Sequence, residues 1–160
     1  MKIIVTGANT PVGSELLAQL RRRSDIDIIT TNLPSTASDL IQHNALLWTS
    51  PEDPIATATS LAPNLQHPFR FGYLNTTSNT TAEQRLERLT QQHPLFRATI
   101  FRPGRILPRT SSLANKLLAP IAIRVDHLAL AMIEEATRNQ AEHYAILNNS
   151  TLRKIADPSH

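Results

Sequence analysis

Met1-Lys-Ile-Ile-Val-Thr-Gly-Ala-Asn-Thr-Pro-Val-Gly-Ser-Glu15 is the stretch that decides the fold. The apolar run at residues 3–5 predicts a short buried strand, and the glycine that follows predicts a tight turn. We expect a helix directly after the turn, because four apolar residues share one of its faces: Val12, Leu16, Leu17 and Leu20. This strand–turn–helix is typical of the first unit of a dinucleotide-binding βαβ fold. In such a unit the free N–H groups of the helix N-terminus favour a phosphate or pyrophosphate.

The glycine spacing of this turn is incomplete. Gly7 and Gly13 occupy the first and third positions of a G-x-x-G-x-x-G pattern, and Thr10 stands at the middle one. A middle glycine lets the backbone approach the pyrophosphate, whereas Thr10 adds a Cβ atom and a hydroxyl. Thr10 is also a good helix N-cap, and Pro11 suits the first helical position, where a missing N–H costs nothing. Two interpretations remain open: the turn binds a dinucleotide with help from the Thr10 hydroxyl, or the helix caps itself and the site is lost.

Length and composition predict one domain, residues 1–160, with a core of its own. The chain has no cysteine, which excludes a disulfide framework and a thiol nucleophile. Its apolar runs are too short for a membrane span or a signal peptide, so we expect a cytoplasmic protein without a membrane partner. The formal net charge of +3 is too modest to indicate nucleic acid.

The charge is nevertheless unevenly distributed along the chain. Between Arg88 and Val125 there is no Asp or Glu, while seven basic residues fall there: Arg88, Arg97, Arg102, Arg105, Arg109, Lys116 and Arg124. This stretch is either a solvated basic face or the lining of a site for an anionic ligand. Binding of nucleic acid through it is disfavoured, because few aromatic side chains are interleaved with these cations.

Strands and helices are expected to alternate along the chain. The predicted strands lie at residues 26–30, 45–49, 69–74, 97–101 and 143–147. The predicted helices lie at residues 37–43, 55–62, 80–92 and 150–156. A further long helix, capped by Asp126, is expected between the strands at residues 97–101 and 143–147. Thr80 and Glu83 have the spacing of a capping box. This alternation predicts an α/β fold with a doubly wound parallel sheet, in which Trp48 and Tyr73 are core residues.

A ligand cleft is expected at the carboxyl ends of the strands, where the strand order reverses. The topology would bring four segments around one crevice: residues 7–13, 49–50, 75–77 and 102–105. Within it, Arg102 would either contact a phosphate or form an ion pair.

With these segments in place, the chain resembles the atypical short-chain dehydrogenase/reductases (SDRs), in particular the small NmrA-like and Tat-interacting-protein-like NAD(P)-binding proteins. Residues 5–13 are similar to the family's V-T-G-A-T-G-x-V-G, and residues 99–106 to its T-x-x-R-P-G-x-I. Weaker similarities lie at residues 45–48, 68–74 and 125–132. The resemblance implies an NAD(P)-binding, oxidoreductase-like Rossmann protein.

The chain departs from that family first in length, because the family usually exceeds 200 residues. If residues 45–49 are the family's fourth strand, the missing piece is its third strand, which lies at an edge of the sheet. The result is a truncated Rossmann fold that lacks an edge strand. If residues 45–49 are instead the third strand, an internal strand is missing, which we consider the poorer interpretation. An exposed edge would invite pairing between two copies of the chain.

The second departure concerns catalysis. Typical members use a serine and a Tyr-x-x-x-Lys pair, in which the lysine lowers the pKa of the tyrosine that transfers the proton. Here the serine position falls on Asn75 or Thr76, and the helix at residues 80–92 has neither Tyr nor Lys. Arginine cannot replace them as a proton donor near neutral pH. The sequence therefore assigns no catalytic residue, and it shows no metal-ligand spacing either.

The cofactor is expected to be NADP or NAD, with NADP slightly favoured because no acid follows the second strand at residues 30–32. A small-molecule substrate or a protein partner would complete the function. The alternative is a non-catalytic regulator on the same fold, which senses dinucleotide or acts through a protein partner. The candidate cofactor-binding residues are Gly7, Asn9, Thr10, Pro11, Val12, Gly13, Thr31, Asn32, Thr49, Ser50, Asn75, Thr76, Arg102, Pro103, Gly104 and Arg105.

Overall fold

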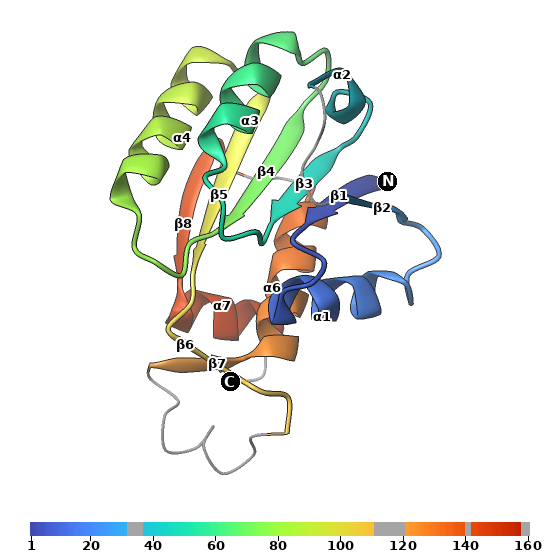
Figure 1. Ribbon diagram of the computed structural model, residues 1–160, viewed down its shortest axis with the longest axis vertical. Coiled ribbons are helices and arrows are strands. Elements are labelled where there is room, and N and C mark those ends of the chain that lie inside the picture. Colours follow the sequence, from blue (N-terminus) through green and yellow to red (C-terminus); the bar gives the residue numbers. More distant parts are fainter. Residues whose placement is uncertain (32–36, 111–120, 140–141, 158–160) are drawn as a thin grey trace.

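The computed structural model describes residues 1–31, 37–110, 121–139 and 142–157 (Figure 1). Its centre is a six-stranded parallel sheet with the strand order β2-β1-β3-β4-β5-β8. The strands are β1 (Lys2–Thr6), β2 (Asp27–Thr31), β3 (Ala45–Trp48), β4 (Phe69–Leu74), β5 (Phe96–Arg102) and β8 (Tyr144–Asn148). Each observed strand overlaps its predicted range, with ends that differ by one residue or coincide.

Helices cover both faces of this sheet (Figure 1). One face carries α1 (Pro11–Leu20), α6 (Val125–Thr137) and α7 (Asn149–Ala156), and its core includes Ile3, Leu16 and Met132. The other face carries α2 (Ala37–Leu40), α3 (Ile55–Leu61), the 3-10 turn η1 (Ala62–Asn64) and α4 (Thr80–Gln92). Buried on both faces, β1 and β3 are nearly continuous apolar runs, as expected of central parallel strands.

The strand order confirms the expected truncation. β1 pairs with β2 on one side and with β3 on the other, so the order reverses at β1. β3 lies between β1 and β4, in the place of the fourth strand of the longer fold. β2 therefore forms the edge of the described sheet, and the interpretation in which an internal strand is lost is wrong.

A second, small sheet lies below the first and was not predicted. β6 (Arg105–Leu107) pairs in parallel with β7 (Ala122–Arg124). The turn before β6 needs a glycine, because a Cβ atom on Gly104 would lie 1.9 Å from the carbonyl oxygen of Ile121. Asn149 at the start of α7 accepts from the Gly104 amide and donates to the Ala122 carbonyl, at 3.3 Å each, which fixes this sheet against the main one.

Two predicted helix caps are wrong. α6 begins after Arg124, and Asp126 lies inside its first turn, where it binds the Arg124 guanidinium instead of capping the helix. α4 is capped by Asn79, whose Oδ1 accepts from the Ala82 amide at 3.1 Å. Glu83 takes no part in a capping box, because its carboxylate turns to Arg102. In both cases a carboxylate that could satisfy backbone amides has an arginine partner instead.

Candidate functional site

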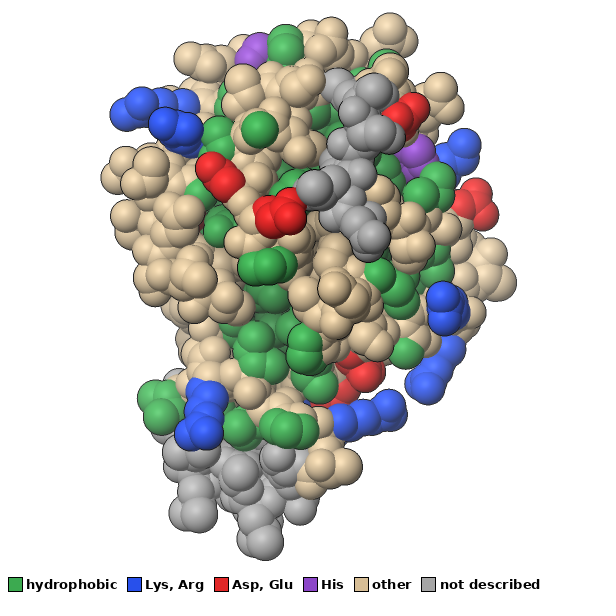
Figure 2. Space-filling model, in the orientation of Figure 1, with side chains coloured by type: hydrophobic (Ala, Val, Ile, Leu, Met, Phe, Trp, Pro, Cys, Tyr) green, Lys and Arg blue, Asp and Glu red, His purple; other side chains and the backbone are tan. Residues whose placement is uncertain are grey.

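A cavity of about 600 Å³ opens at the carboxyl ends of β1, β3 and β4, where the strand order reverses. It extends from the N-terminus of α1 to β6. Figure 2 shows a band of hydrophobic side chains on this face, above the β6–β7 sheet, with acidic and basic side chains beside it. The lining residues are Thr10, Pro11, Val12, Thr49, Ser50, Pro51, Tyr73, Leu74, Thr76, Thr77, Ile106, Leu107, Pro108, Arg109 and Val125.

The turn below this cavity requires both of its glycines. Gly7 has φ +71°, and a Cβ atom there would lie 2.7 Å from the Ser50 amide nitrogen. Gly13, in the first turn of α1, packs so closely on the turn that a Cβ atom would lie 2.1 Å from the Gly7 carbonyl oxygen. The two glycines therefore let α1 start directly over the end of β1, close to β3.

Thr10 is the N-cap of α1, as its sequence position predicted. Its Oγ1 accepts from the Gly13 amide at 3.0 Å and donates to the Gly7 carbonyl at 2.8 Å. It also lies 3.2 Å from the Thr49 hydroxyl, which itself donates to the carbonyl of Thr6. The side chain at the middle position of the motif is thus held by both ends of the turn and by Thr49, the residue after β3.

This capping uses most of the donors that a helix N-terminus would offer to an anion. The Thr10 amide binds the Gly7 carbonyl, the Gly13 amide binds the Thr10 hydroxyl, and Pro11 has no N–H. Within the described residues, Val12 has the one amide of this first turn that finds no acceptor. Self-capping is therefore real, and a phosphate over α1 would meet a single free helix amide together with nearby hydroxyl groups.

The cavity has a polar wall and an apolar wall. Hydroxyl groups come from the turn and from the ends of β3 and β4, through Thr10, Thr49, Ser50, Thr76 and Thr77. An apolar part of the lining comes from β6, the residue after it and the first residue of α6, through Ile106, Leu107, Pro108 and Val125. Arg109 is the cation among the lining residues.

The structure gathers part of the predicted site at this cavity. Thr10, Pro11, Val12, Thr49, Ser50 and Thr76 line it. Asn32 lies outside the described residues, as does Lys116 of the basic stretch. The remaining candidates are described but do not line the cavity: Gly7, Asn9, Gly13, Thr31, Asn75, Arg102, Pro103, Gly104 and Arg105.

Asn75 stands behind the cavity wall in a buried polar cluster. Its Oδ1 accepts from the amides of Thr77 and Asn79, which shapes the loop between β4 and α4. Its Nδ2 donates to Glu83 Oε1 at 2.7 Å. Glu83 in turn binds Arg102 through two contacts, with Nε to Oε1 at 2.6 Å and Nη2 to Oε2. This arrangement answers the question about Arg102, which forms an ion pair within the protein.

Burial and charge set the protonation of this cluster. The Glu83 side chain is 4% exposed, while that of Arg102 is 42% exposed. Hydrogen bonds from Arg102 hold the pKa of the Glu83 carboxyl below its usual range, against the opposing effect of burial. Beside them, Tyr144 donates to the Glu83 carbonyl, and burial with the nearby carboxylates raises the pKa of Tyr144 to about 12. The cluster is therefore a charged support for the cleft wall near neutral pH.

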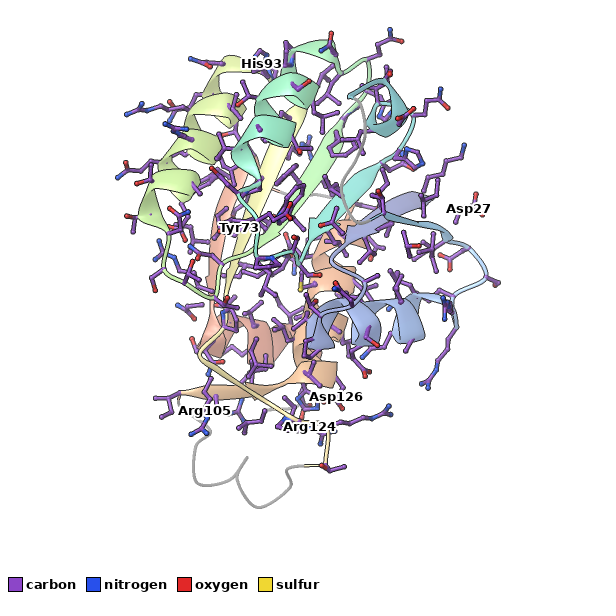
Figure 3. All side chains as sticks on the ribbon, viewed as in Figure 1. Asp27, Tyr73, His93, Arg105, Arg124 and Asp126 are labelled. Carbon is purple, nitrogen blue, oxygen red and sulfur yellow. The ribbon has the colours of Figure 1, made fainter. Side chains whose placement is uncertain are left out.

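Tyr73 is a core residue, as expected, and it also lines the cavity (Figure 3). It is 5% exposed, and burial raises the pKa of its hydroxyl, with the charges of Asp53 and Glu83 acting in the same direction. A tyrosine that transfers a proton near neutral pH needs the opposite shift. No lysine stands among the described lining residues to supply it.

Sequence reasoning missed the apolar wall, and it named Arg109 only as one of the seven cations of the acid-free stretch. The pairing of β6 with β7 places this wall over the cavity, and strands of three residues are too short to show a periodic pattern. The signal that could have pointed to it was the R-P-G turn, which directs the following residues back over the cleft. In the described part of the chain, no three His, Asp or Glu side chains gather as a metal site, and no helix is long and apolar enough to cross a membrane.

Comparison with known proteins supports the fold. No family model and no curated protein matches the sequence. Among solved structures, human epimerase family protein SDR39U1 with NADPH is 14% identical, with a TM-score of 0.63 over 92% of this chain and 73% of that one. UDP-glucuronic acid 4-epimerase from Bacillus cereus, in complex with UDP-glucuronic acid and NAD, is 13% identical, with a TM-score of 0.67 over 92% of this chain and 77% of that one.

The fold is a doubly wound Rossmann fold, shorter than the two structures above. It exists at this size elsewhere, because lin1944 from Listeria innocua matches over 91% of this chain and 98% of its own, with 14% identity and a TM-score of 0.56. At such low identity these likenesses show the architecture alone. They confirm the expected α/β doubly wound sheet.

Proposed function

We propose that this chain binds a nicotinamide dinucleotide in the cavity above the Gly7–Gly13 turn. The observation that carries the proposal is the packing of α1 on that turn. Because Gly13 has no Cβ atom, it packs directly on the Gly7 carbonyl. This packing brings the N-terminus of α1 to the edge of a cavity, at the point where the strand order reverses. Ligands of doubly wound sheets bind at this point. SDR39U1 with NADPH and the Bacillus cereus epimerase with NAD, which share the fold, give the proposal its chemistry.

In this proposal the pyrophosphate lies over the start of α1, near Asn9, Thr10 and the free amide of Val12. Thr49 and Ser50 flank a ribose, and the loop at Thr76 borders the nicotinamide. The hydroxyls of Thr10 and Thr49 already donate to the carbonyls of Gly7 and Thr6, so the hydroxyls of Ser50 and Thr76 would supply hydrogen bonds that glycine-turn amides supply elsewhere. Because neutral hydroxyls replace aligned helix amides, we expect weaker binding than a complete glycine motif would give.

The proposed cofactor is NADP in preference to NAD. Thr31 ends β2, and no carboxylate stands there to accept hydrogen bonds from a ribose 2′-hydroxyl. An acid at that position would also repel a 2′-phosphate, so its absence favours the phosphorylated form.

The cleft offers little machinery for tyrosine-driven reduction. The hydroxyl of Tyr73 has a raised pKa, and Arg109 does not release a proton near neutral pH. Any hydride transfer would take its proton from water or from the substrate itself. The same observation favours a second candidate function, a non-catalytic regulator that senses dinucleotide through this cleft.

Titration of the purified protein with NADPH and NADH, followed by nicotinamide fluorescence and by calorimetry, tests the proposal. We expect micromolar binding with NADPH ahead of NADH. Arg88→Gln, on the exposed face of α4, serves as a matched control and should bind equally well. Absence of heat and of a fluorescence change up to millimolar NADPH and NADH would refute dinucleotide binding. Turnover of carbonyl compounds by the NADPH complex would decide against the purely regulatory role.

A further inference from the structure

In the acid-free stretch from Arg88 to Val125, Arg102 and Arg124 are hydrogen-bonded to carboxylates, whereas the ion pairs of Arg109 are longer, at 4.0 Å. Arg102 holds Glu83 through two contacts, and Arg124 holds Asp126 in the same manner. Figure 3 shows Arg124 and Asp126 together at the start of α6, and Arg105 at the other end of the small sheet. None of these arginines lines the cavity, whereas Arg109 does.

Within the described residues, Arg109 forms two long ion pairs but no hydrogen bond with its neighbours. Its nearest carboxylates are Glu15 Oε1, at 4.0 Å from Nη1, and Asp126 Oδ2, at 4.0 Å from Nε. Both distances exceed a hydrogen bond. Asp126 is already bound by Arg124, and Glu15 accepts from Gln19 at 2.9 Å. Within the described residues, the guanidinium of Arg109, 58% exposed, therefore keeps its donors available to a ligand.

Arg109 has apolar residues of the cavity wall beside it, as well as the carboxylates of Glu15 and Asp126. Ile106, Leu107 and Pro108 precede it along the chain, and Val125 at the start of α6 completes the wall. The hydroxyl groups that suit a dinucleotide come from other elements of the lining, the turn and the residues that follow β3 and β4. A ligand on the β6 side would thus meet an apolar surface and one planar cation at its rim.

We propose that the β6 side of this cavity binds a small organic acid, with its apolar body against Ile106 and Leu107 and its carboxylate on Arg109. A planar guanidinium matches a carboxylate through two parallel hydrogen bonds. A cation on an open surface would not select a carboxylate over other anions in this way. The apolar wall excludes water from one side of that contact and favours an acid with an alkyl or aryl body. The inference deepens the proposed function by naming the class of substrate. It rests on that function, which assigns the hydroxyl-lined part of the cavity to the dinucleotide.

Hexanoate is a suitable probe, with hexanamide as its neutral counterpart and hexyl phosphate as the tetrahedral anion. Binding is measured by calorimetry and by NMR shifts, with and without NADPH, in the native protein, in Arg109→Gln and in the control Arg88→Gln. We expect hexanoate to bind about tenfold more tightly than hexanamide, and Arg109→Gln to remove that advantage, since a hydrogen bond to a charged group contributes about this much. The control variant should match the native protein.

Each result has a defined meaning. Equal binding of hexanoate and hexanamide, or an undiminished preference in Arg109→Gln, overturns the inference. Tighter binding of hexyl phosphate than of hexanoate overturns the carboxylate assignment. Because NADPH binding is read separately, loss of the hexanoate preference beside intact NADPH binding refutes this inference alone. An Arg109-dependent preference without NADPH binding supports the anion site and refutes the proposed cofactor.

Discussion

Replacing Thr10 with glycine should strengthen dinucleotide binding, although it removes a helix cap. In the structure the Thr10 hydroxyl accepts from the Gly13 amide at 3.0 Å, and this occupies a donor at the helix N-terminus. Thr10→Gly frees that amide and removes the Cβ atom between the turn and the cavity. The Gly7 carbonyl keeps the amide of residue 10 as a donor, because that bond belongs to the backbone. The turn should therefore keep its shape.

The expected gain follows from one released donor. A hydrogen bond to a charged phosphate contributes about 1.5–3 kcal/mol, which corresponds to a roughly 10- to 150-fold lower dissociation constant. The opposing cost is small, because glycine at an N-cap position loses only a few tenths of a kcal/mol relative to threonine. Binding and stability should thus move in opposite directions, with a large change in affinity and a small one in the free energy of unfolding.

Calorimetric titration of NADPH into the native protein, Thr10→Gly and Thr10→Ser measures this directly. Thr10→Ser keeps the hydroxyl that caps α1, so its affinity should stay close to that of the native protein. The reasoning fails if Thr10→Gly binds no more tightly than Thr10→Ser while both variants show native-like thermal unfolding. Weaker binding by Thr10→Gly than by Thr10→Ser would mean that the hydroxyl itself contacts the phosphate.

Three further predictions concern stability and assembly. Gly13→Ala should lower the free energy of unfolding by about 3 kcal/mol, because its Cβ atom would overlap the Gly7 carbonyl; a native-like urea midpoint would contradict this. Glu83→Gln should cost about 1–3 kcal/mol at pH 7, because the carboxylate partner of Arg102 is lost. The pKa of Glu83 is lower in the folded than in the unfolded protein, so the stability advantage of the native protein over Glu83→Gln should fall as the pH drops below about 4. A difference in urea unfolding that does not change with pH would contradict this prediction. The exposed edge at β2, with Ile29 47% exposed, should let two copies pair, so that the mass in gel filtration rises with concentration and Ile29→Lys abolishes the rise; a monomer at every concentration would exclude this pairing.

Local sequence signals predicted the main sheet and its helices well. β1 and α1 could be located because the apolar residues, the glycines and the Thr10–Pro11 start all act over a few neighbouring positions. These features depend on short-range periodicity and turn chemistry, which a single sequence displays. The absence of the edge strand was instead inferred from the resemblance to a longer family, once residues 45–49 were taken as that family's fourth strand.

The errors came from partners far apart in the chain. Glu83 has the spacing of a capping box, yet its carboxylate lies against Arg102, 19 residues later. β6 and β7 are strands because Leu107 and Arg124 come into register, and neither has enough residues to show a pattern alone. The wall that Ile106 contributes to the cavity depends on this pairing. Tertiary contacts of this kind leave no local trace in the sequence.

The loss of the strand beyond β2 shifts recognition toward one end of the ligand. None of the described residues of β2 lines the cavity, and the lining extends from the turn toward β6 and Arg109. A dinucleotide bound here would hold its nicotinamide half against protein and extend its adenosine half past an open edge of the sheet. Nicotinamide mononucleotide should then compete with NADPH, as a fragment that retains the contacts within the cavity. In this shortened fold, the adenosine half would add the choice between NADPH and NADH at the open edge, while the cavity holds the nicotinamide half.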